Sequence, residues 1–596
     1  MAQTNLASYV QHVIVVIQEN RTPDNLFNED ANLYKNGGHV RPNLPGQLTN
    51  YGACLPPNAK GDSYVALQSN PLYTCWDLTH SHGTAGQPNP DGWLETWDSG
   101  AMDGACNIKV LWQQTQDYCQ PPGPPCANSG PGGTSTCPYA YVENAPWAPP
   151  QQDSILDPYF QIAEQYGFAN YTFATNQGPI SPAHQFLLSG TSAPDYNGYD
   201  DGGCGSNKIP CYKWFDSNNV SATVEGATGF GCTADYGIES LDIDPGQNQS
   251  YAYAPNYVPG ANPGFPCYTH NSLPTLLDNA EPNPISWVYY SRDRMGGYSG
   301  IWTAPTAIND LCDTTGTGGE CGPNSDWQTH VGPFRPDQGK YLNDEAPILT
   351  DIASCSLQQV SWVIPDGNWS DHAGSENSPG DGGPSWVAAI VNAVGSQPTC
   401  ANGDKYWNDT VILVVWDDWG GWYDDVVPPD CASNPCTGYS GGGGNGKQYV
   451  YGFRVPLLVV GAYTQQVTPQ GGYISGPQSN PTCPGSYYCH DFGSILNFIE
   501  YAFGTGGYPL GIAPPNGAGI SQDPTWPYAD YFAMDYSPHV QYSYSLSDFF
   551  NFSPSSFHSF QTIQGAKYGE TCFHNPNQTG CFPGTYPMDP DNDANE

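Results

Sequence analysis

Two short runs of apolar residues lie far apart in the chain, at 13–17 and 411–415, and each run ends in polar residues. The polar residues that follow them are Glu19, Asn20, Asp417 and Asp418. Unbroken runs rich in valine and isoleucine are typical of parallel strands that are buried on both faces. Because open α/β sheets place their active sites at the carboxyl ends of such strands, the pattern predicts oxygen ligands at one edge of a sheet.

The same pattern along the chain predicts further elements that alternate between strand and helix. Strands are expected at residues 286–290, 361–364 and 455–460, and helices at 385–394, directly after Pro384, and at 494–503. Proline suits the first turn of a helix, and the second predicted helix carries apolar residues at helical spacing. This alternation predicts an α/β fold with a doubly wound, mostly parallel sheet.

Length and local composition predict one large catalytic domain with long insertions. The chain has 596 residues, which exceeds the size at which a single core usually stops growing. Stretches rich in glycine, proline and cysteine are the expected insertions, and they cover about residues 28–150, 193–280 and 303–345. Residues 1–510 are predicted to form the catalytic domain, and the aromatic-rich residues 511–596 are predicted to wrap on its core.

The cysteines predict disulfides that pin the inserted loops. There are 20 of them, an even number, spread from Cys54 to Cys581. Disulfides in an oxidising compartment are the expected use of so many cysteines. A metal site is a weaker interpretation because the chain has no Cys-x-x-Cys pair, the spacing that zinc sites usually carry. The pairing of the cysteines cannot be read from the sequence.

The charge balance favours a secreted or periplasmic protein that works in an acidic medium. The chain has 57 acidic residues and 15 lysines and arginines, a formal net charge of −42, yet only 12% of its residues are charged. Protonation near pH ~4 would remove most of the self-repulsion of such a chain. No signal peptide is visible, so the sequence is expected to begin at the mature end.

The composition also limits which partners are expected. Nucleic acid is not an expected partner, because its phosphate backbone binds through clustered lysine and arginine, which this chain lacks. No apolar stretch reaches the roughly 18 residues of a membrane span, so no transmembrane segment is expected. The sequence does not indicate an oligomeric state.

A set of short motifs occurs in a fixed order along the chain. The segments are residues 18–27, 80–82 with 100–104, 178–184 with 189–191, 286–290, 370–372, 416–429, 454–456 and 492–496. In this order the set resembles the phosphoesterase family that contains bacterial non-specific phospholipases C and secreted acid phosphatases. Any one motif alone would not be specific, but the ordered set is. The resemblance implies a core similar to that of alkaline phosphatase.

The resemblance implies that Glu19, Asn20, Asp417 and Asp418 bind one divalent metal ion. Oxygen ligands of this kind suit Ca²⁺, Mg²⁺, Mn²⁺ or iron. Such an ion would take up the charge that develops on phosphate oxygens during ester hydrolysis. The alternative is that these side chains are helix caps and loop residues whose oxygens accept hydrogen bonds from backbone N–H groups.

The expected nucleophile departs from the family pattern. Members usually read Gly-Pro-Ser or Gly-Pro-Thr, then one residue and proline, with the hydroxyl as nucleophile. Here Ile180 takes that position and the hydroxyl comes one residue later, at Ser181. We expect Ser181 to attack phosphorus, and the alternatives are attack by a metal-bound water or a site without activity. Ser181 could also be only a turn serine beside Pro182.

Histidines are expected to supply the proton for the leaving group. The resemblance places His372 in the family's Ser-Asp/Glu-His position, and His80 and His82 are further candidates. A protonated imidazole both stabilises phosphate oxygens and donates a proton at acidic pH. A histidine taken alone is more often structural.

Three further residues, Arg21, His184 and Asp424, are expected to contact the substrate. Arg21 would neutralise the substrate phosphate in a chain with few basic residues, although a buried salt bridge to a carboxylate fits the sequence equally well. A second departure from the family lies at Asp425, where the family usually has histidine. This departure predicts altered substrate handling.

Together these features predict a secreted, metal-dependent hydrolase of phosphate esters, of the acid phosphatase type. A phospholipase C that acts on phosphodiester lipids is the close alternative. The lack of an obvious amphipathic or basic membrane-docking face in the sequence favours soluble monoesters over lipids. A third hypothesis, from another class, is a catalytically silent extracellular scaffold that kept the fold, as Ile180 and Asp425 suggest.

Overall fold

The protein is described here from a computed structural model of the 596-residue chain. The residues that the structure describes are 6–40, 51–54, 63–74, 76–80, 102–112, 126–127, 129, 133–147, 153–178, 180–190, 214–216, 232, 240–243, 249–252, 273–291, 302–312, 321–336, 339–373, 381–428, 451–468, 471–476, 490–504, 510 and 546–582.

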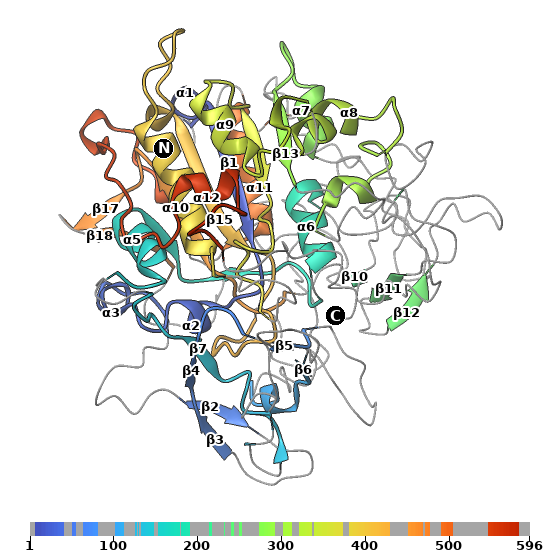
Figure 1. The fold of residues 1–596 in the computed structure, drawn as a ribbon, viewed down its shortest axis with the longest axis vertical. Helices are drawn as coiled ribbons and strands as arrows, with labels where there is room; N and C mark the ends of the chain where they lie inside the picture. The colour runs from blue at the N-terminus through green and yellow to red at the C-terminus, as the bar shows by residue number, and fades with distance from the viewer. Residues whose placement is uncertain are drawn as a thin grey trace, which may run out of the picture.

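Within these residues, a sheet of eight strands forms the centre of the molecule (Figure 1). In spatial order the strands are β13 (Trp287–Tyr290), β14 (Val360–Val363), β1 (His12–Gln18), β15 (Thr410–Trp416), β16 (Leu457–Gly461), β8 (Gly167–Ala169), β18 (Gly471–Ser475) and β17 (Gln466–Thr468). The first four strands run parallel, whereas β16 is antiparallel to both of its neighbours. The structure therefore confirms a mixed α/β fold with a large, mostly parallel sheet.

All of the strands predicted from apolar runs lie in this sheet. The side chains of residues 13–17 in β1 and 411–415 in β15 are at most 3% exposed. Strands can be apolar on both sides only where other elements cover both faces of the sheet. The unbroken runs are therefore explained by the position of β1 and β15 in the middle of the sheet.

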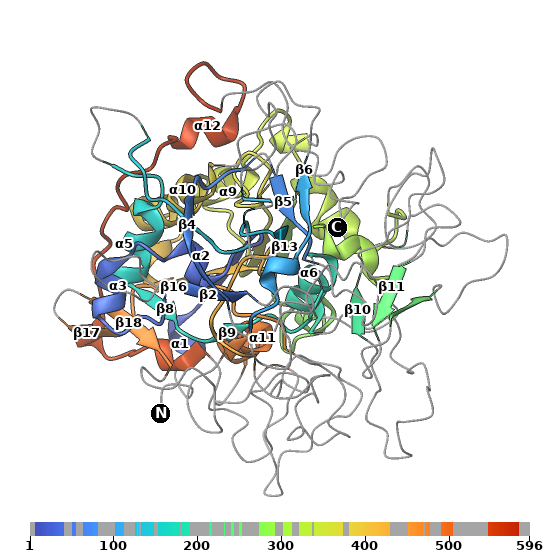
Figure 2. The ribbon, with the colours of Figure 1, turned by 90° about the horizontal axis from the view of Figure 1, so that it is seen from below.

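Helices cover both faces of the sheet, as Figure 2 shows from below. On one face lie α5 (Asp157–Gln165), α9 (Pro347–Ala353) and α10 (Gly383–Ser396), and on the other lie α6 (Ile180–Ser189) and α11 (Phe492–Phe503). The predicted helices at 385–394 and 494–503 are confirmed as α10 and α11. Pro384 lies in the first turn of α10, and Asp491 and Ser494 cap α11 through reciprocal side-chain and backbone hydrogen bonds.

Shorter elements surround this core. The helices are α1 (Leu6–Tyr9), α2 (Pro23–Leu26), α3 (Ala31–Lys35), α7 (Leu273–Asp278), α8 (Trp327–His330) and α12 (Glu570–His574). Four small sheets have two strands each: β2 (Tyr51–Cys54) with β3 (Ser63–Ala66), β4 (Gln68–Asn70) with β7 (Ala140–Val142), β5 (Trp76–Leu78) with β6 (Val110–Trp112), and β9 (Thr172–Phe173) with β19 (His490–Asp491). A further sheet has three strands, β10 (Trp214–Asp216), β11 (Ser240–Ile243) and β12 (Gln249–Ala252). No helix in the described part of the chain has the length and apolar character needed to cross a bilayer.

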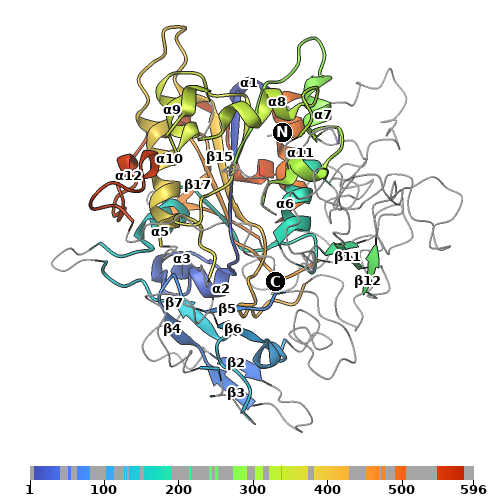
Figure 3. The same cartoon turned by 45° about the vertical axis from the view of Figure 1, so that its right-hand side comes forward.

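The small sheets formed by β2 to β7 lie beyond the carboxyl edge of the central sheet. In Figures 1 and 3, β1 runs downward from α1 to α2, and these small sheets lie below its lower end. They come from the segment predicted as the insertion at 28–150. His80 follows β5 closely, so this insertion delivers a candidate catalytic side chain to the sheet edge.

Disulfides close loops, as the cysteine count predicted. Among the described residues they join Cys126 to Cys137, Cys312 to Cys321, Cys355 to Cys400 and Cys572 to Cys581. The first two lie inside the segments 28–150 and 303–345, and the third links the end of α9 to the chain between α10 and β15. Such bridges are typical of proteins that fold in an oxidising compartment.

The described part of the C-terminal segment, residues 546–582, packs on the core. Phe573 and Phe582 each lie with ring centroids 5.4 Å from that of Trp369. In the same segment, His574 Nδ1 in α12 lies 2.6 Å from Asp344 Oδ1, so an ion pair ties α12 to the segment before α9. The division of the chain near residue 510 stays a prediction.

The ion pair between His574 and Asp344 should stabilise the docked C-terminal segment most in mildly acidic solution. The hydrogen bond with Asp344 raises the pKa of His574 above 6.5 although burial opposes it, and His574 and Thr350 lower the pKa of Asp344 below 3.8 against the effect of burial. The contribution of His574 is therefore complete below pH 6.5 and fades as the pH rises through its raised pKa, whereas that of Asp344 fades as the pH falls below 3.8.

A double-mutant cycle with His574→Gln and Asp344→Asn should give a coupling energy of at most about 1 kcal/mol near pH 5, because the pair is partly exposed. The coupling should shrink above neutral pH. Chemical denaturation across pH 4 to 9 measures it, and a coupling that grows with pH would contradict this assignment.

Candidate metal centre

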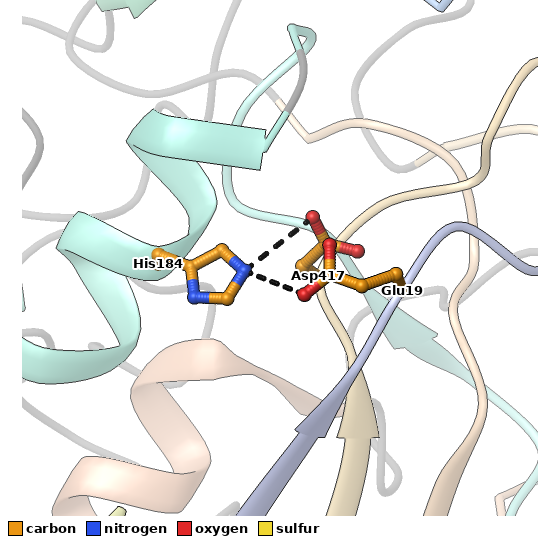
Figure 4. A group of neighbouring side chains, drawn as sticks. All are labelled: Glu19, His184 and Asp417. Carbon is orange, nitrogen blue, oxygen red and sulfur yellow. Dashed lines mark hydrogen bonds and ion pairs between the residues drawn. The ribbon is translucent and has the colours of Figure 1, made fainter. Parts of the chain in front are cut away.

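The candidate centre forms where β1 and β15 end side by side. The two strands pair in parallel, and their last paired residues are Gln18 and Trp416. Glu19 and Asp417 are the next residues of each strand, so the register of the two strands places their carboxylates next to each other (Figure 4). A hydrogen bond of 3.0 Å from Asp417 N to Gln18 O continues the pairing past the strand ends.

His184 completes the group from α6, on one face of the sheet. Figure 4 shows its ring directed at both carboxylates. Its Nε2 atom lies 2.9 Å from Glu19 Oε1 and 3.8 Å from Asp417 Oδ2, and all three side chains are fully buried. One ligand atom from each of the three residues lies within 4.8 Å of the others. Three elements that are far apart in the sequence therefore deliver metal-binding atoms to one point.

Burial shifts the pKa values of these groups in opposite directions. Burial, reinforced by the charge of Glu19, raises the pKa of Asp417 well above 3.8. Burial lowers the pKa of His184 to about 4, and the charge of Asp417 opposes that shift. Without a cation, burial therefore favours the uncharged forms of Asp417 and His184, whereas a bound cation would favour ionised carboxylates beside a neutral imidazole.

The chemistry of the donor set fits a divalent cation. Asn20 Oδ1 and Asp417 Oδ2 are buried and accept no hydrogen bond from the part of the chain that the structure describes. Carboxylate and amide oxygens suit hard cations, and the imidazole nitrogen of His184 extends the range to manganese, iron and zinc. The alternative that backbone groups satisfy the carboxylates holds in part, because Asn20 N donates to Asp417 Oδ1 at 3.0 Å.

Asn20 and Gly420 bring the two strand ends into close contact. Asn20 has φ +58°, the left-handed region that asparagine tolerates better than most residues. Gly420 has φ +61°, and a Cβ atom there would lie 2.6 Å from the carbonyl oxygen of Asn20. Both strands therefore turn sharply after their candidate metal ligands, and a larger residue at 420 would push the turns apart.

Two histidines lie beside this group. His80 Nε2 is 3.2 Å from Asn20 Nδ2 and 3.7 Å from Asp418 Oδ2, and its Nδ1 is 2.8 Å from Leu78 O. The ring centroid of His372 lies 6.1 Å from that of His80. The structure thus brings His80 and His372 to the same edge as the expected metal ligands. His82, the third expected histidine, lies outside the described residues.

Ser181 lies in the first turn of α6 and is buried. It precedes His184 by three residues, and residues at that spacing share one face of a helix. The face of α6 that carries Ser181 is therefore the face from which His184 reaches Glu19 and Asp417. Its role as nucleophile stays a prediction.

Arg21 does not point to this group. Its guanidinium donates from Nε and Nη2 to the carbonyl oxygen of Asp371, at 2.9 and 2.6 Å, and from Nη2 to Leu72 O. Nη1 donates to Asn25 Oδ1 at 3.2 Å, and the group lies over the ring of Trp422. These contacts make Arg21 a bridge between loops, and its contact with substrate stays a prediction.

Asp424 belongs to a second buried cluster. Its carboxylate accepts from Arg454 Nε at 3.0 and 3.1 Å, and Asp24 and Asp425 each lie 3.5 Å from Arg454 Nη2. Burial raises the pKa of Asp424, while Arg454 opposes the shift. Asp424 therefore binds a buried arginine, and the substrate role expected for it stays untested.

The position of His184 also suits a metal ligand, because its Nε2 faces the two carboxylates. The contact with substrate that the sequence predicts for it stays a prediction. The signal available was its spacing from Ser181, which places both on one helical face. That spacing does not reveal which side of the sheet the helix covers.

The fold and the site define a mixed α/β protein with a candidate metal centre at the carboxyl edge of its sheet. The chain belongs to the phosphoesterase family, because the model of that family matches residues 147–506.

Curated relatives of this chain share limited identity with it. It is 27% identical to the non-hemolytic phospholipase C of Burkholderia pseudomallei over 164 residues, which are 26% of this chain and 20% of that protein. It is 25% identical to the non-hemolytic phospholipase C of Pseudomonas aeruginosa over 174 residues, 26% of this chain and 21% of that protein. It is 26% identical to phospholipase C B of Mycobacterium tuberculosis over 217 residues, 33% of this chain and 35% of that protein. The matches therefore span about a fifth to a third of these relatives.

Removal of one ligand should abolish tight metal binding at this centre. Metal-stripped protein titrated with Mn²⁺ in a calorimeter should bind one ion per chain. Asp417→Asn and His184→Asn should each weaken binding by more than about 100-fold, because even residues that only orient a metal ligand commonly change affinity by 10–100-fold.

Asp351→Asn is the matched control, since Asp351 is a buried carboxylate that binds Tyr290 and Tyr341 elsewhere in the protein. This variant should bind Mn²⁺ like the wild type. Equal affinity in His184→Asn and wild type would remove His184 from the ligand set, and no binding by wild type would contradict the centre.

Proposed function

We propose that this protein is a metal-dependent hydrolase of phosphate esters. The observation that carries the proposal is the convergence of Glu19, Asp417 and His184 at one buried point on the carboxyl edge of the sheet. Membership of the phosphoesterase family supports it. A divalent cation held there by these residues, with Asn20 and Asp418 beside them, would stabilise the charge that develops on phosphate oxygens.

Within this proposal, Ser181 is the nucleophile. Its hydroxyl belongs to the first turn of α6, on the face that carries His184. The preceding residue, Ile180, is buried and offers no hydroxyl, so it fills space where the family usually has serine or threonine. The Ser181 hydroxyl must lose its proton as it attacks phosphorus, and the carboxylates of the candidate metal centre would be the acceptors for that proton.

His80 and His372 are the proposed proton donors for the leaving group. The contact between His80 Nδ1 and Leu78 O fixes the Nδ1–H tautomer, so Nε2 faces Asn20 and Asp418. His372 Nδ1 likewise donates to the carbonyl oxygen of Ala373. Nε2 is therefore the atom that would take up and release a proton in His372, whereas His80 Nε2 accepts a hydrogen bond from Asn20 Nδ2 and would donate a proton only when that contact opens.

The substrate is proposed to be a small phosphate monoester, which makes the protein acid phosphatase-like. The strongly acidic composition, with a net charge of −42, suits work at low pH in a secreted or periplasmic setting. Residues 1–510 would form the catalytic domain and 511–596 its wrap. A phosphodiester lipid is the second candidate substrate, because the relatives described above are named phospholipases C.

Turnover of a chromogenic phosphate monoester across pH 3 to 8, with each of Ca²⁺, Mg²⁺, Mn²⁺ and Fe²⁺, tests the proposal. We expect activity that needs metal and that falls by at least about 100-fold in Ser181→Ala, the usual scale for loss of a group that takes part in proton transfer or attack. Ser189→Ala, a buried serine two turns later on α6, is the matched control and should keep activity.

The other outcomes separate the remaining hypotheses. Full activity in Ser181→Ala would point to attack by water. Faster release of phosphocholine from phosphatidylcholine vesicles than of phosphate from monoesters would favour the lipase. No turnover of either substrate with any of the metals would contradict the proposal and leave the silent scaffold.

A further inference from the structure

The loop that carries His372 is tied to the ends of both strands of the metal centre. Asp371 N donates to Gln18 Oε1 at 3.1 Å, and Gln18 Nε2 donates to Trp369 O at 3.0 Å. On the other strand, Trp416 Nε1 donates to Asp371 Oδ2 at 3.0 Å. Gln18 and Trp416 are register partners and directly precede Glu19 and Asp417. The loop is thus hydrogen-bonded to the two residues that directly precede the proposed metal ligands.

The carboxylate of Asp371 is enclosed on its remaining sides. It is fully buried, and Oδ2 also accepts a hydrogen bond from Tyr159 Oη in α5 at 2.8 Å. Gly383, at the start of α10, packs so closely that a Cβ atom there would lie 2.0 Å from Asp371 Oδ1. The side chain therefore has no room to rotate, and its backbone is fixed with it.

Arg21 links the loop of His372 to the segment that carries His80. It follows Asn20, and its guanidinium joins the carbonyl oxygen of Asp371 to that of Leu72. Leu72 belongs to the segment that leads into β5 and His80. One buried arginine thus holds the loop of His372 and the segment of His80 against the end of β1.

We propose that Asp371 is a positioning residue that fixes His372 relative to the metal-binding strand ends. The inference deepens the proposed function and rests on it, because His372 is taken as a proton donor there. Asp371 touches neither substrate nor the reacting phosphorus in this scheme. It acts by accepting hydrogen bonds from Trp416 and Tyr159 while its backbone binds Gln18 and Arg21.

Three variants test this role by steady-state kinetics over a range of pH. Asp371→Ala should lower kcat by about 10–100-fold with a smaller change in KM, the scale on which residues that orient active-site groups act. It should also shift the limb of the pH profile of kcat that reports the protonation of His372. Asp371→Asn keeps an acceptor oxygen in the same place and should restore most of the lost kcat. Tyr159→Phe removes one donor to Oδ2 from outside the site and should give a smaller loss.

Hydrogen exchange of residues 366–373 gives a readout that needs no activity. Exchange of this loop should rise in Asp371→Ala and stay near wild type in Asp371→Asn. If wild type turns over no phosphate ester, the proposed function fails, yet raised exchange would still show that Asp371 holds the loop. Unchanged loop exchange in Asp371→Ala, or a kcat and pH profile equal to wild type in active protein, overturns the positioning role.

Discussion

The parallel pairing of β1 with β15 is the constraint on which the rest of the site depends. Side chains alternate along a strand, so a shift of one residue in register would send one carboxylate to the other face. With Gln18 opposite Trp416, Glu19 and Asp417 leave the sheet together. Both runs are apolar on both faces, so their matched lengths and polar ends, rather than an alternation of side chains, favour this register.

Two of the protein's few cations lie inside, around this edge. Arg21 and Arg454 are both fully buried, in a chain with only 15 lysines and arginines. Arg21 binds carbonyl oxygens of two loops, and Arg454 binds a cluster of three aspartates on the turn and helix next to the centre. Planar guanidinium groups suit such multiple contacts. The described side-chain contacts of both arginines go to these loops and aspartates, and the proposed divalent cation would offset the charge of Glu19 and Asp417.

The sequence was sufficient for the elements that short-range pattern determines. The apolar runs of β1 and β15 and the helices α10 and α11 were predictable, because burial on two faces and helical spacing leave local signatures. The place of His184 was not, since it depends on which face of the sheet α6 covers. Arg21 directly follows the candidate ligands Glu19 and Asn20, yet its guanidinium binds the carbonyl oxygens of Asp371 and Leu72 after the left-handed turn at Asn20. Tertiary contacts of this kind have no local signature.

Anomalous diffraction from crystals of the protein loaded with Mn²⁺ would locate the metal site directly. We expect one strong peak within coordination distance of Glu19, Asp417 and His184, with the carboxylates and the Nε2 atom directed at it. A peak at another place with these three side chains turned apart, or none at this point under saturating Mn²⁺, would contradict it.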